Sequence, residues 1–148
     1  MCIRDRLYST YGANASNPAY SSTLATPSGD GITNLVKYAM NISPSANAQS
    51  QLPTVTKFNG HPQITFQWNY NISDVTYIIQ ATNTLGGSWT TLATYTSAGG
   101  WVANVAGVAI PPGSVAGNAP YQYEPVVVTD PTTPEPGQNL FLRVSVTR

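Results

Sequence analysis

The chain has 148 residues, about the length of one domain, and its charge is balanced, with six lysines and arginines against six aspartates and glutamates. This balance excludes the basic surface typical of a nucleic-acid-binding protein. No run of about 18 apolar residues occurs, so no membrane span is predicted. The single cysteine, Cys2, leaves the chain without a disulfide or a cysteine-based metal site.

The start of the chain differs from the rest. Residues 1–6, Met-Cys-Ile-Arg-Asp-Arg, resemble translated sequencing-adapter DNA found at the start of metagenomic reading frames, and we predict that they are foreign to the native protein. The native N-terminus, with any signal peptide, is then expected to be missing. Residues 7–29 are rich in small and polar residues without a period, and we predict a linker or the end of a preceding domain.

Residues 30–44 are predicted to form one short amphipathic helix and its connection. Asp30 is expected to cap the helix N-terminus. Apolar residues recur at the helical spacing i, i+3, i+4 and i+7, which predicts a buried stripe. The stripe consists of Ile32, Leu35, Val36 and Ala39.

From residue 53 the apolar residues alternate with a period of two, so residues 53–148 are predicted as a β-domain of about seven strands. The segments 64–70 and 75–82 are expected to form a hairpin through a tight turn. The predicted strands are 54–58, 64–70, 75–82, 89–96, 101–110, 121–129 and 140–147. The expected core residues are Phe66, Trp68, Tyr77, Ile79, Leu142 and Val144.

No helical crossover lies between these strands, which indicates antiparallel sheets. Proline-rich loops at 111–120 and 130–137 favour Greek-key crossings. The predicted fold is therefore all-β, an antiparallel sandwich of the immunoglobulin or fibronectin type III kind preceded by the short helix. A closed eight-stranded barrel is the alternative.

Three motifs occur in a characteristic order. They are Asp-Gly-Ile-Thr-Asn-Leu-Val-Lys-Tyr-Ala at 30–39, Val-Thr-Tyr-Ile-Ile-Gln-Ala-Thr at 75–82 with Trp89-Thr90 after it, and Leu-Phe-Leu-Arg-Val at 140–144. Over residues 30–148 the chain resembles a C-terminal module of large secreted and surface proteins of Verrucomicrobia-type bacteria. The resemblance implies an extracellular or cell-surface location, with the preceding domains of the parent protein and the cell envelope as partners. It implies no activity.

Related modules often carry a loop before the helix that resembles a calcium-binding repeat. Aligned on Gly31, such a loop would take its ligands, with Lys37 at the position of the bidentate acidic one, from Thr26, Ser28, Asp30, the Ile32 carbonyl and Asn34. Only one carboxylate is present in this pattern, and the Lys37 ammonium would repel a cation. We therefore expect a degenerate loop with no metal, and no cofactor.

The titratable side chains form no recognisable catalytic motif. Glu124 and Asp130 lie along one strand and its end, and they are predicted to be exposed, solvated charges rather than the opposed pair of a glycosidase. His61 follows the turn dipeptide Asn59-Gly60 and is expected to be solvated. The residue types leave a Ser-His-Asp triad open, but no Gly-x-Ser-x-Gly elbow is present. No catalytic residue is predicted.

Two functional hypotheses follow. The first is a non-catalytic structural, attachment or sorting module at the C-terminus of a modular extracellular protein. The second is a carbohydrate-binding module that uses exposed aromatic rings, since sugar stacking needs few charges. Its candidate ligand-binding residues are Trp89, Trp101, Tyr121 and Tyr123.

Overall fold

The computed structural model describes residues 2–110, 113–135 and 137–148. The remaining positions belong to the predicted foreign segment and the two predicted proline-rich loops, and they lie outside the described residues; they are Met1, Pro111, Pro112 and Pro136. The chain forms two compact units. Unit 1 comprises Met1–Leu52, Gln67–Ile72 and Val115–Glu124, and unit 2 comprises Pro53–Phe66, Ser73–Ser114 and Pro125–Arg148.

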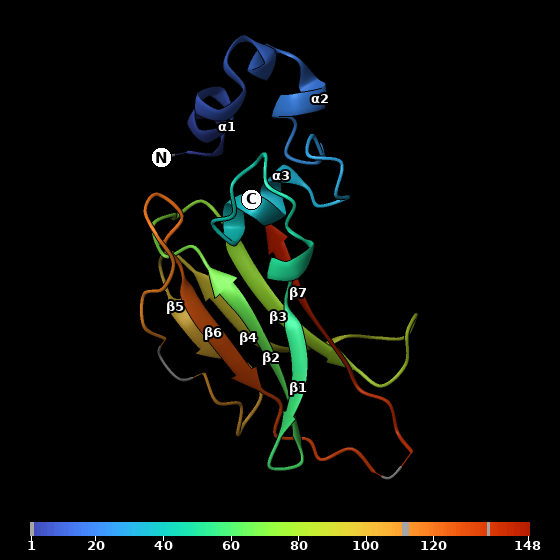
Figure 1. Ribbon diagram of the computed structural model, residues 1–148. Helices are drawn as coiled ribbons and strands as arrows, with labels where there is room; N and C mark the ends of the chain where they lie inside the picture. The colour runs from blue at the N-terminus through green and yellow to red at the C-terminus, as the bar shows by residue number, and fades with distance from the viewer. Residues whose placement is uncertain (1, 111–112, 136) are drawn as a thin grey trace. The chain divides into compact units, whose positions relative to one another are not determined.

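Unit 1 contains the helices of the chain (Figure 1). They are α1 (Ile3–Tyr11), η1 (Gly12–Ser16), α2 (Pro18–Ser21), α3 (Asn34–Ala39) and η2 (Gln49–Gln51). Residues 7–29 thus carry most of α1 together with η1 and α2. Ile3 and Arg6, from the segment predicted to be foreign, are buried in the first turns of α1. The origin of that segment stays a prediction.

Helix α3 begins later than predicted and turns a different face inward. The Oγ1 atom of Thr33, rather than the Asp30 carboxylate, caps it by accepting from the Val36 N–H at 3.4 Å. The helix ends where Asn41 takes a positive φ of 52°, and the Ile42 N–H donates back to the Lys37 carbonyl at 2.8 Å. Of the predicted stripe only Ala39 is buried, while Ile32, Leu35 and Val36 are half-buried.

Two polar side chains take the buried face of α3 because each has partners inside unit 1. The Nδ2 group of Asn34 donates to the carbonyl oxygens of Tyr20 and Ser22 at 2.8 and 2.9 Å. Lys37 forms an ion pair with Asp30. Buried polar groups with hydrogen-bond partners are tolerated. The burial pattern of α3 therefore follows these partners and not the apolar period.

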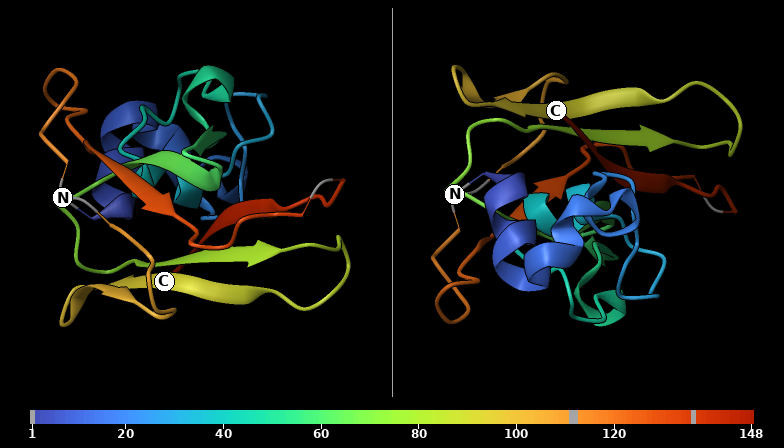
Figure 2. Two further views of the ribbon diagram at one scale, coloured as in Figure 1. Left: turned by 90° about the horizontal axis from the view of Figure 1, so that it is seen from below. Right: turned by 90° about the horizontal axis from the view of Figure 1, so that it is seen from above.

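Unit 2 is a β-sandwich of two antiparallel sheets, which Figures 1 and 2 show as two layers. One sheet has the strand order β1-β2-β6 and the other has the order β5-β4-β3-β7. The strands are β1 (Thr54–Phe58), β2 (His61–Trp68), β3 (Thr76–Thr82), β4 (Thr90–Thr96), β5 (Gly100–Ala103), β6 (Glu124–Thr129) and β7 (Phe141–Thr147). The predicted sandwich and the number of strands are confirmed, and the described residues form two separate sheets and no closed barrel. The strand predicted at 101–110 is shorter than expected, since β5 ends at Ala103.

The predicted turn at Asn59-Gly60 is confirmed, but the predicted hairpin of β2 with β3 is wrong. Asn59 and Gly60 both have positive φ, 50° and 83°, and they join β1 to β2. Strands β2 and β3 lie in different sheets. The reason is found at Asn69, whose backbone N–H and side chain donate to the carbonyl oxygens of Ala39 and Tyr38, each at 2.9 Å. This anchor in unit 1 lies between β2 and β3 along the chain, where the predicted hairpin needs a tight turn.

The sandwich core forms where the inward faces of the two sheets meet. The rings of Phe66 on β2 and Tyr77 on β3 stack at 6.3 Å between centroids, and Ile79 is 0 % exposed. These three predicted core residues are confirmed, whereas Leu142 and Val144 are only half-buried. Trp68 was expected in the same core, but it belongs to unit 1, where its ring lies edge-on to Tyr70.

Candidate functional site

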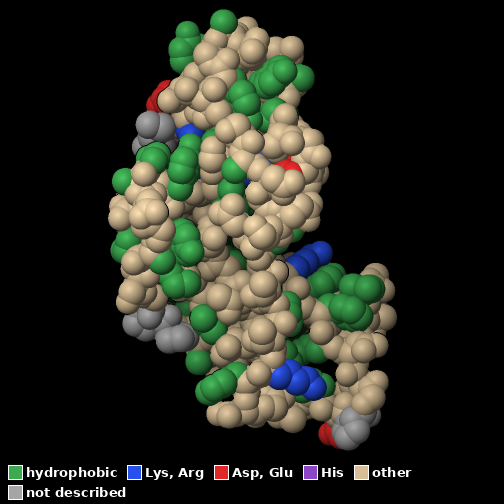
Figure 3. Space-filling view, viewed as in Figure 1, with side chains coloured by type: hydrophobic (Ala, Val, Ile, Leu, Met, Phe, Trp, Pro, Cys, Tyr) green, Lys and Arg blue, Asp and Glu red, His purple; other side chains and the backbone are tan. Residues whose placement is uncertain are grey.

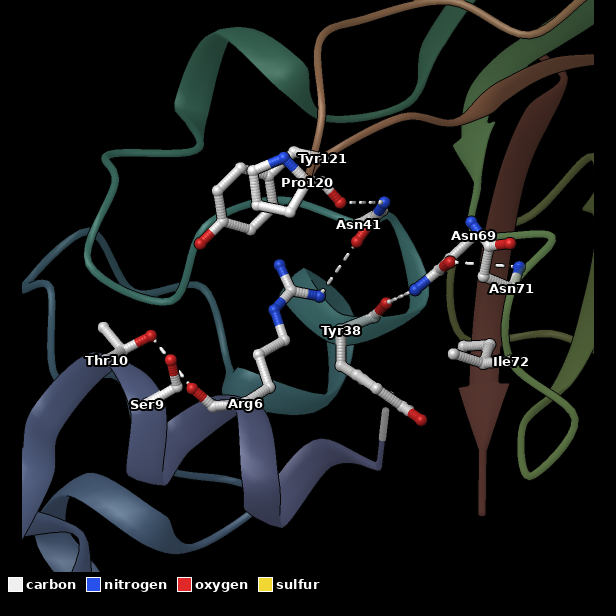
Figure 4. A pocket seen from close by; sticks show the side chains of 10 residues that line it. All are labelled: Arg6, Ser9, Thr10, Tyr38, Asn41, Asn69, Asn71, Ile72, Pro120 and Tyr121. Carbon is white, nitrogen blue, oxygen red and sulfur yellow. Dashed lines mark hydrogen bonds between the residues drawn. The ribbon is translucent and has the colours of Figure 1, made fainter.

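A hollow of about 170 Å³ lies within unit 1. Arg6 from α1 lines it and donates to Oδ1 of Asn41 at 3.3 Å and to the carbonyl oxygen of Ile42. Its guanidinium carbon lies 5.0 Å from the ring centroid of Tyr121 (Figure 4). Burial lowers the pKa of Arg6. Because Arg6 belongs to the segment predicted to be foreign, we assign no function to this hollow.

Lys37 fills the centre of the predicted calcium-like loop. Its Nζ atom lies 2.8 Å from Oδ2 of Asp30, and the two side chains are 1 % and 0 % exposed. The ammonium also donates to the Ser28 hydroxyl and to the carbonyl oxygens of Pro44 and Ala46, at 3.3 and 2.6 Å for the carbonyls. Carboxylate, hydroxyl and carbonyl oxygens are the ligands that calcium takes in proteins. Of these oxygens only those of Asp30 and Ser28 belong to the predicted calcium-like loop, and the Asn34 side chain of that loop is hydrogen-bonded to other carbonyls.

Asp30 is held as a carboxylate by four donors. Besides Lys37, it accepts from the backbone N–H groups of Ala48 at 2.8 Å and Ile32 at 2.9 Å and from the Ser28 hydroxyl at 2.8 Å. Burial alone raises the pKa of the Asp30 carboxyl, but these donors outweigh burial and hold the pKa well below its ordinary value. The folded state of unit 1 therefore favours the ionised form of Asp30.

This lowered pKa predicts an acid dependence of stability. A carboxyl whose pKa is lower in the folded state stabilises the fold fully above its unfolded pKa of about 3.9, and this contribution disappears as the pH falls below that value. We expect wild type to exceed Asp30→Asn in stability by a constant amount above about pH 5 and by a shrinking amount below about pH 4. Hydrogen exchange of the α3 amides measures this difference. A difference that grows on acidification would contradict the assignment.

The two candidate tryptophans lie in separate environments in unit 2. Trp101 on β5 belongs to an aromatic cluster with Phe66, Tyr77 and Tyr95, at centroid distances of 5.9, 6.1 and 5.2 Å. Trp89 precedes β4 and is half-buried, and the guanidinium carbon of Arg143 lies 3.9 Å from its ring centroid. The Trp101 ring therefore packs in the sandwich, whereas the Trp89 ring has an arginine side chain over one of its faces.

The two candidate tyrosines lie in unit 1 and do not form one platform. Tyr121 lines the hollow that contains Arg6. Tyr123 pairs with Ala116 through two backbone hydrogen bonds of 2.8 and 3.0 Å. Its ring lies beside Gly117, which has a φ of 81°. A Cβ atom on Gly117 would lie only 3.2 Å from this ring. The role of all four aromatic residues in binding stays a prediction.

A second hollow, of about 250 Å³, lies within unit 2, and we call it the sandwich-end cleft. It is formed where β3 and β6 end and where β4 and β7 begin. Its polar lining consists of Asp130 and of uncharged side chains, namely Thr82, Asn83, Ser88, Thr90, Thr132, Gln138 and Asn139. Its apolar lining consists of Ala81, Leu92, Val105, Pro134 and Leu140. Uncharged side chains also dominate the face shown in Figure 3.

Asp130 is the one carboxylate among the described residues that line the sandwich-end cleft, and it is only 2 % exposed. Its Oδ1 atom accepts from the Thr132 N–H at 2.8 Å, and its own N–H donates to the Pro62 carbonyl at 2.9 Å. Within the described part of the chain no lysine or arginine forms an ion pair with it. The cleft thus holds a buried carboxyl side chain with no lysine or arginine paired to it among the described residues.

The prediction of an exposed, solvated Asp130 is wrong. Val126, Val128 and Asp130 are spaced two residues apart, and all three are buried. Successive side chains of a strand point to opposite faces, so Asp130 continues the inward face of β6. The alternation of side chains that predicts strand β6 therefore also predicts that the Asp130 carboxyl lies on its buried face.

Compared with protein-family models, with curated proteins and with solved structures, the chain matches none of them. Among the described residues, no helix is both long and apolar enough to cross a membrane. The described part of the chain also contains no group of three or more metal-binding side chains. The sandwich-end cleft is therefore the candidate functional site.

Proposed function

We propose that the chain is a non-catalytic accessory module that attaches a larger protein by binding carbohydrate in the sandwich-end cleft. The observation that carries the proposal is Asp130, a buried carboxylate that opens into the cleft and has no cationic partner among the described residues. This proposal joins the two sequence-based hypotheses, attachment and sugar binding, but it moves the binding site away from the surface aromatic rings.

The chemistry of the cleft suits a polyhydroxylated ligand. An ionised carboxylate only accepts hydrogen bonds, and sugar hydroxyls donate them, while the amides of Gln138 and Asn139 both donate and accept. Pro134 and Leu140 offer apolar surface to the C–H face of a sugar ring. The volume of about 250 Å³ is below the range for drug-sized ligands, which favours one sugar residue over a longer segment.

The surface aromatics are less suited to this task. Trp101 is packed among three other rings, and a substitution there would disturb the sandwich before it tested binding. Trp89 has one ring face under Arg143. Ser88 and Thr90 line the cleft, and alternation along the chain then turns Trp89 to the outer face of the sheet.

The sandwich itself is proposed to be of the immunoglobulin or fibronectin type III kind. In support, the first two strands pair in one sheet and the third strand crosses to the other, as the strands A, B and C of those folds do. The motif resemblance supports a place in a secreted or surface protein of modular build, with its preceding domains as partners. A carbohydrate ligand on the cell envelope or outside the cell agrees with that location.

Asp130→Asn tests the proposed site. The asparagine Oδ1 can still accept from the Thr132 N–H, so the substitution removes the charge and leaves the turn in place. We expect wild type to be retarded in affinity electrophoresis by at least one of soluble β-glucan, mannan and xylan. Asp130→Asn is expected to weaken that binding by about 10- to 100-fold, the loss of a hydrogen bond to a charged group.

Asp74→Asn is the matched control, because Asp74 also belongs to unit 2 but pairs with Arg148 at 2.8 Å in a partly exposed ion pair. It should bind the polysaccharide as wild type does. Equal retardation of wild type and Asp130→Asn would move the binding elsewhere on the chain. Free migration of the wild type in all three polysaccharides would contradict carbohydrate binding.

A further inference from the structure

The two sheets of unit 2 have four edge strands, β1 and β6 in one sheet and β5 and β7 in the other. Open edges invite pairing with another chain, and proteins protect them with charges, prolines, short strands or covering segments. β1 presents the exposed Lys57, and β5 has only four residues. β6 contains Pro125, and the N–H of Thr129 at its end donates to the Ala109 carbonyl at 3.2 Å. Three edges are therefore protected.

β7 is the longest of the four edge strands, and among the described residues it has neither a proline nor a covering segment. It has seven residues without proline, and it pairs with β3 without a break in register from Phe141 to Thr147. Its one charged side chain, Arg143, donates to Oε1 of Gln80 at 3.0 and 2.8 Å and lies over Trp89. This guanidinium is thus held on the outer face of the sheet. Among the described residues, no strand pairs with the other edge of β7.

The inward face of β7 is also incompletely covered. Val144 and Val146 lie opposite Ile79 and Tyr77 of β3 and point into the sandwich with them. The two β3 residues are 0 % exposed, whereas both valines are only half-buried. A further strand beside β7 would continue the apolar face and cover these side chains.

We propose that β7 pairs antiparallel with β7 of a second copy of this chain, across a twofold axis at Val144. In this register all seven residues are paired. Leu142 stands opposite Val146 of the partner subunit on the apolar face, and Arg143 stands opposite Ser145 of the partner subunit on the outer face. An axis at Arg143 would oppose two guanidinium groups, and an axis at Ser145 would pair fewer residues. The strand is therefore self-complementary in one register, as a twofold interface requires.

Opposite charges at Ser145 test both the pairing and its register. Ser145 lies on the outer face, so Ser145→Glu and Ser145→Arg should both leave the sandwich folded. In the dimer, a glutamate at position 145 would attract Arg143 of the partner subunit at two symmetric positions. An arginine at position 145 would repel the same guanidinium group. We expect the dimer dissociation constant, measured by sedimentation velocity on the full chain, to be about tenfold or more lower for Ser145→Glu than for Ser145→Arg.

Thr56→Glu and Thr56→Arg provide matched controls on the exposed edge strand β1. They should have the same dissociation constant as wild type. The measurement is made without sugar, so its outcome does not depend on whether the sandwich-end cleft binds carbohydrate. A protein that stays monomeric throughout the concentration series, or a dimer equally stable with glutamate and arginine at position 145, would overturn the proposal.

Discussion

Replacing Lys37 with methionine is expected to lower the stability of unit 1 by about 3–5 kcal/mol, the usual loss when one partner of a buried ion pair is removed. Methionine keeps most of the side-chain volume but leaves the Asp30 carboxylate buried without its cation. The remaining donors to Asp30 are neutral and do not replace the charge. Hydrogen exchange of the α3 amides reports the loss, because α3 carries Lys37.

The chain supplies a matched control for this prediction. Arg148 and Asp74 form an ion pair at the same N–O distance of 2.8 Å, but their side chains are 38 % and 34 % exposed. Arg148→Met should therefore cost about 1 kcal/mol or less, since exposed pairs contribute little. Adding Asp30→Asn to Lys37→Met should recover part of the loss, because it removes the stranded charge. Equal losses for Lys37→Met and Arg148→Met would show that burial of the pair has no energetic role.

Substituting Ile79 with alanine is expected to destabilise unit 2 by about 2–5 kcal/mol through lost burial and the cavity left behind. Ile79 is 0 % exposed on the central strand β3, and β4 and β7 flank it on both sides. The neighbouring strands leave little freedom for the core to collapse into the space. Hydrogen exchange of the β3 amides measures the change.

Ile78→Ala is the control at the next position of the same strand. It removes the same atoms from a half-buried side chain on the outer face, where it lies opposite Thr94 and Ser145. We expect a loss of about 1 kcal/mol or less. A loss at Ile78 equal to that at Ile79 would contradict the assignment of the two faces of β3.

The strands were predictable because their signal is local. Alternation places Phe66, Tyr77 and Ile79 on inward faces whatever strand lies beside them, and Asn59-Gly60 specifies its turn by backbone conformation alone. The pairing of β2 was not predictable in this way. It depends on the anchoring of Asn69 to the end of α3, about thirty residues earlier in the chain.

Two polar side chains are buried although their residue types are typical of the surface. Lys37 has the spacing of a surface residue on α3, and only the converging oxygens of Asp30, Ser28 and two carbonyls make its burial favourable. Asp130 was assigned to the surface by its residue type, although its place after Val126 and Val128 put it inside. For Asp130 a local signal, the alternation along the strand, indicates burial, whereas for Lys37 no local signal does, because its oxygen partners come from other segments.

The composition of unit 1 has a consequence for where this chain can be divided. Unit 1 consists of three separate segments, Met1–Leu52, Gln67–Ile72 and Val115–Glu124, so no single cut separates it from the sandwich. A fragment starting at residue 53 would keep Asn69 and Gln122 but lose Tyr38 and Asn41, to which they are hydrogen-bonded. The boundary predicted at residue 53 coincides with the start of unit 2, but two segments of unit 1 lie beyond it, so a fragment cut there would carry only part of unit 1.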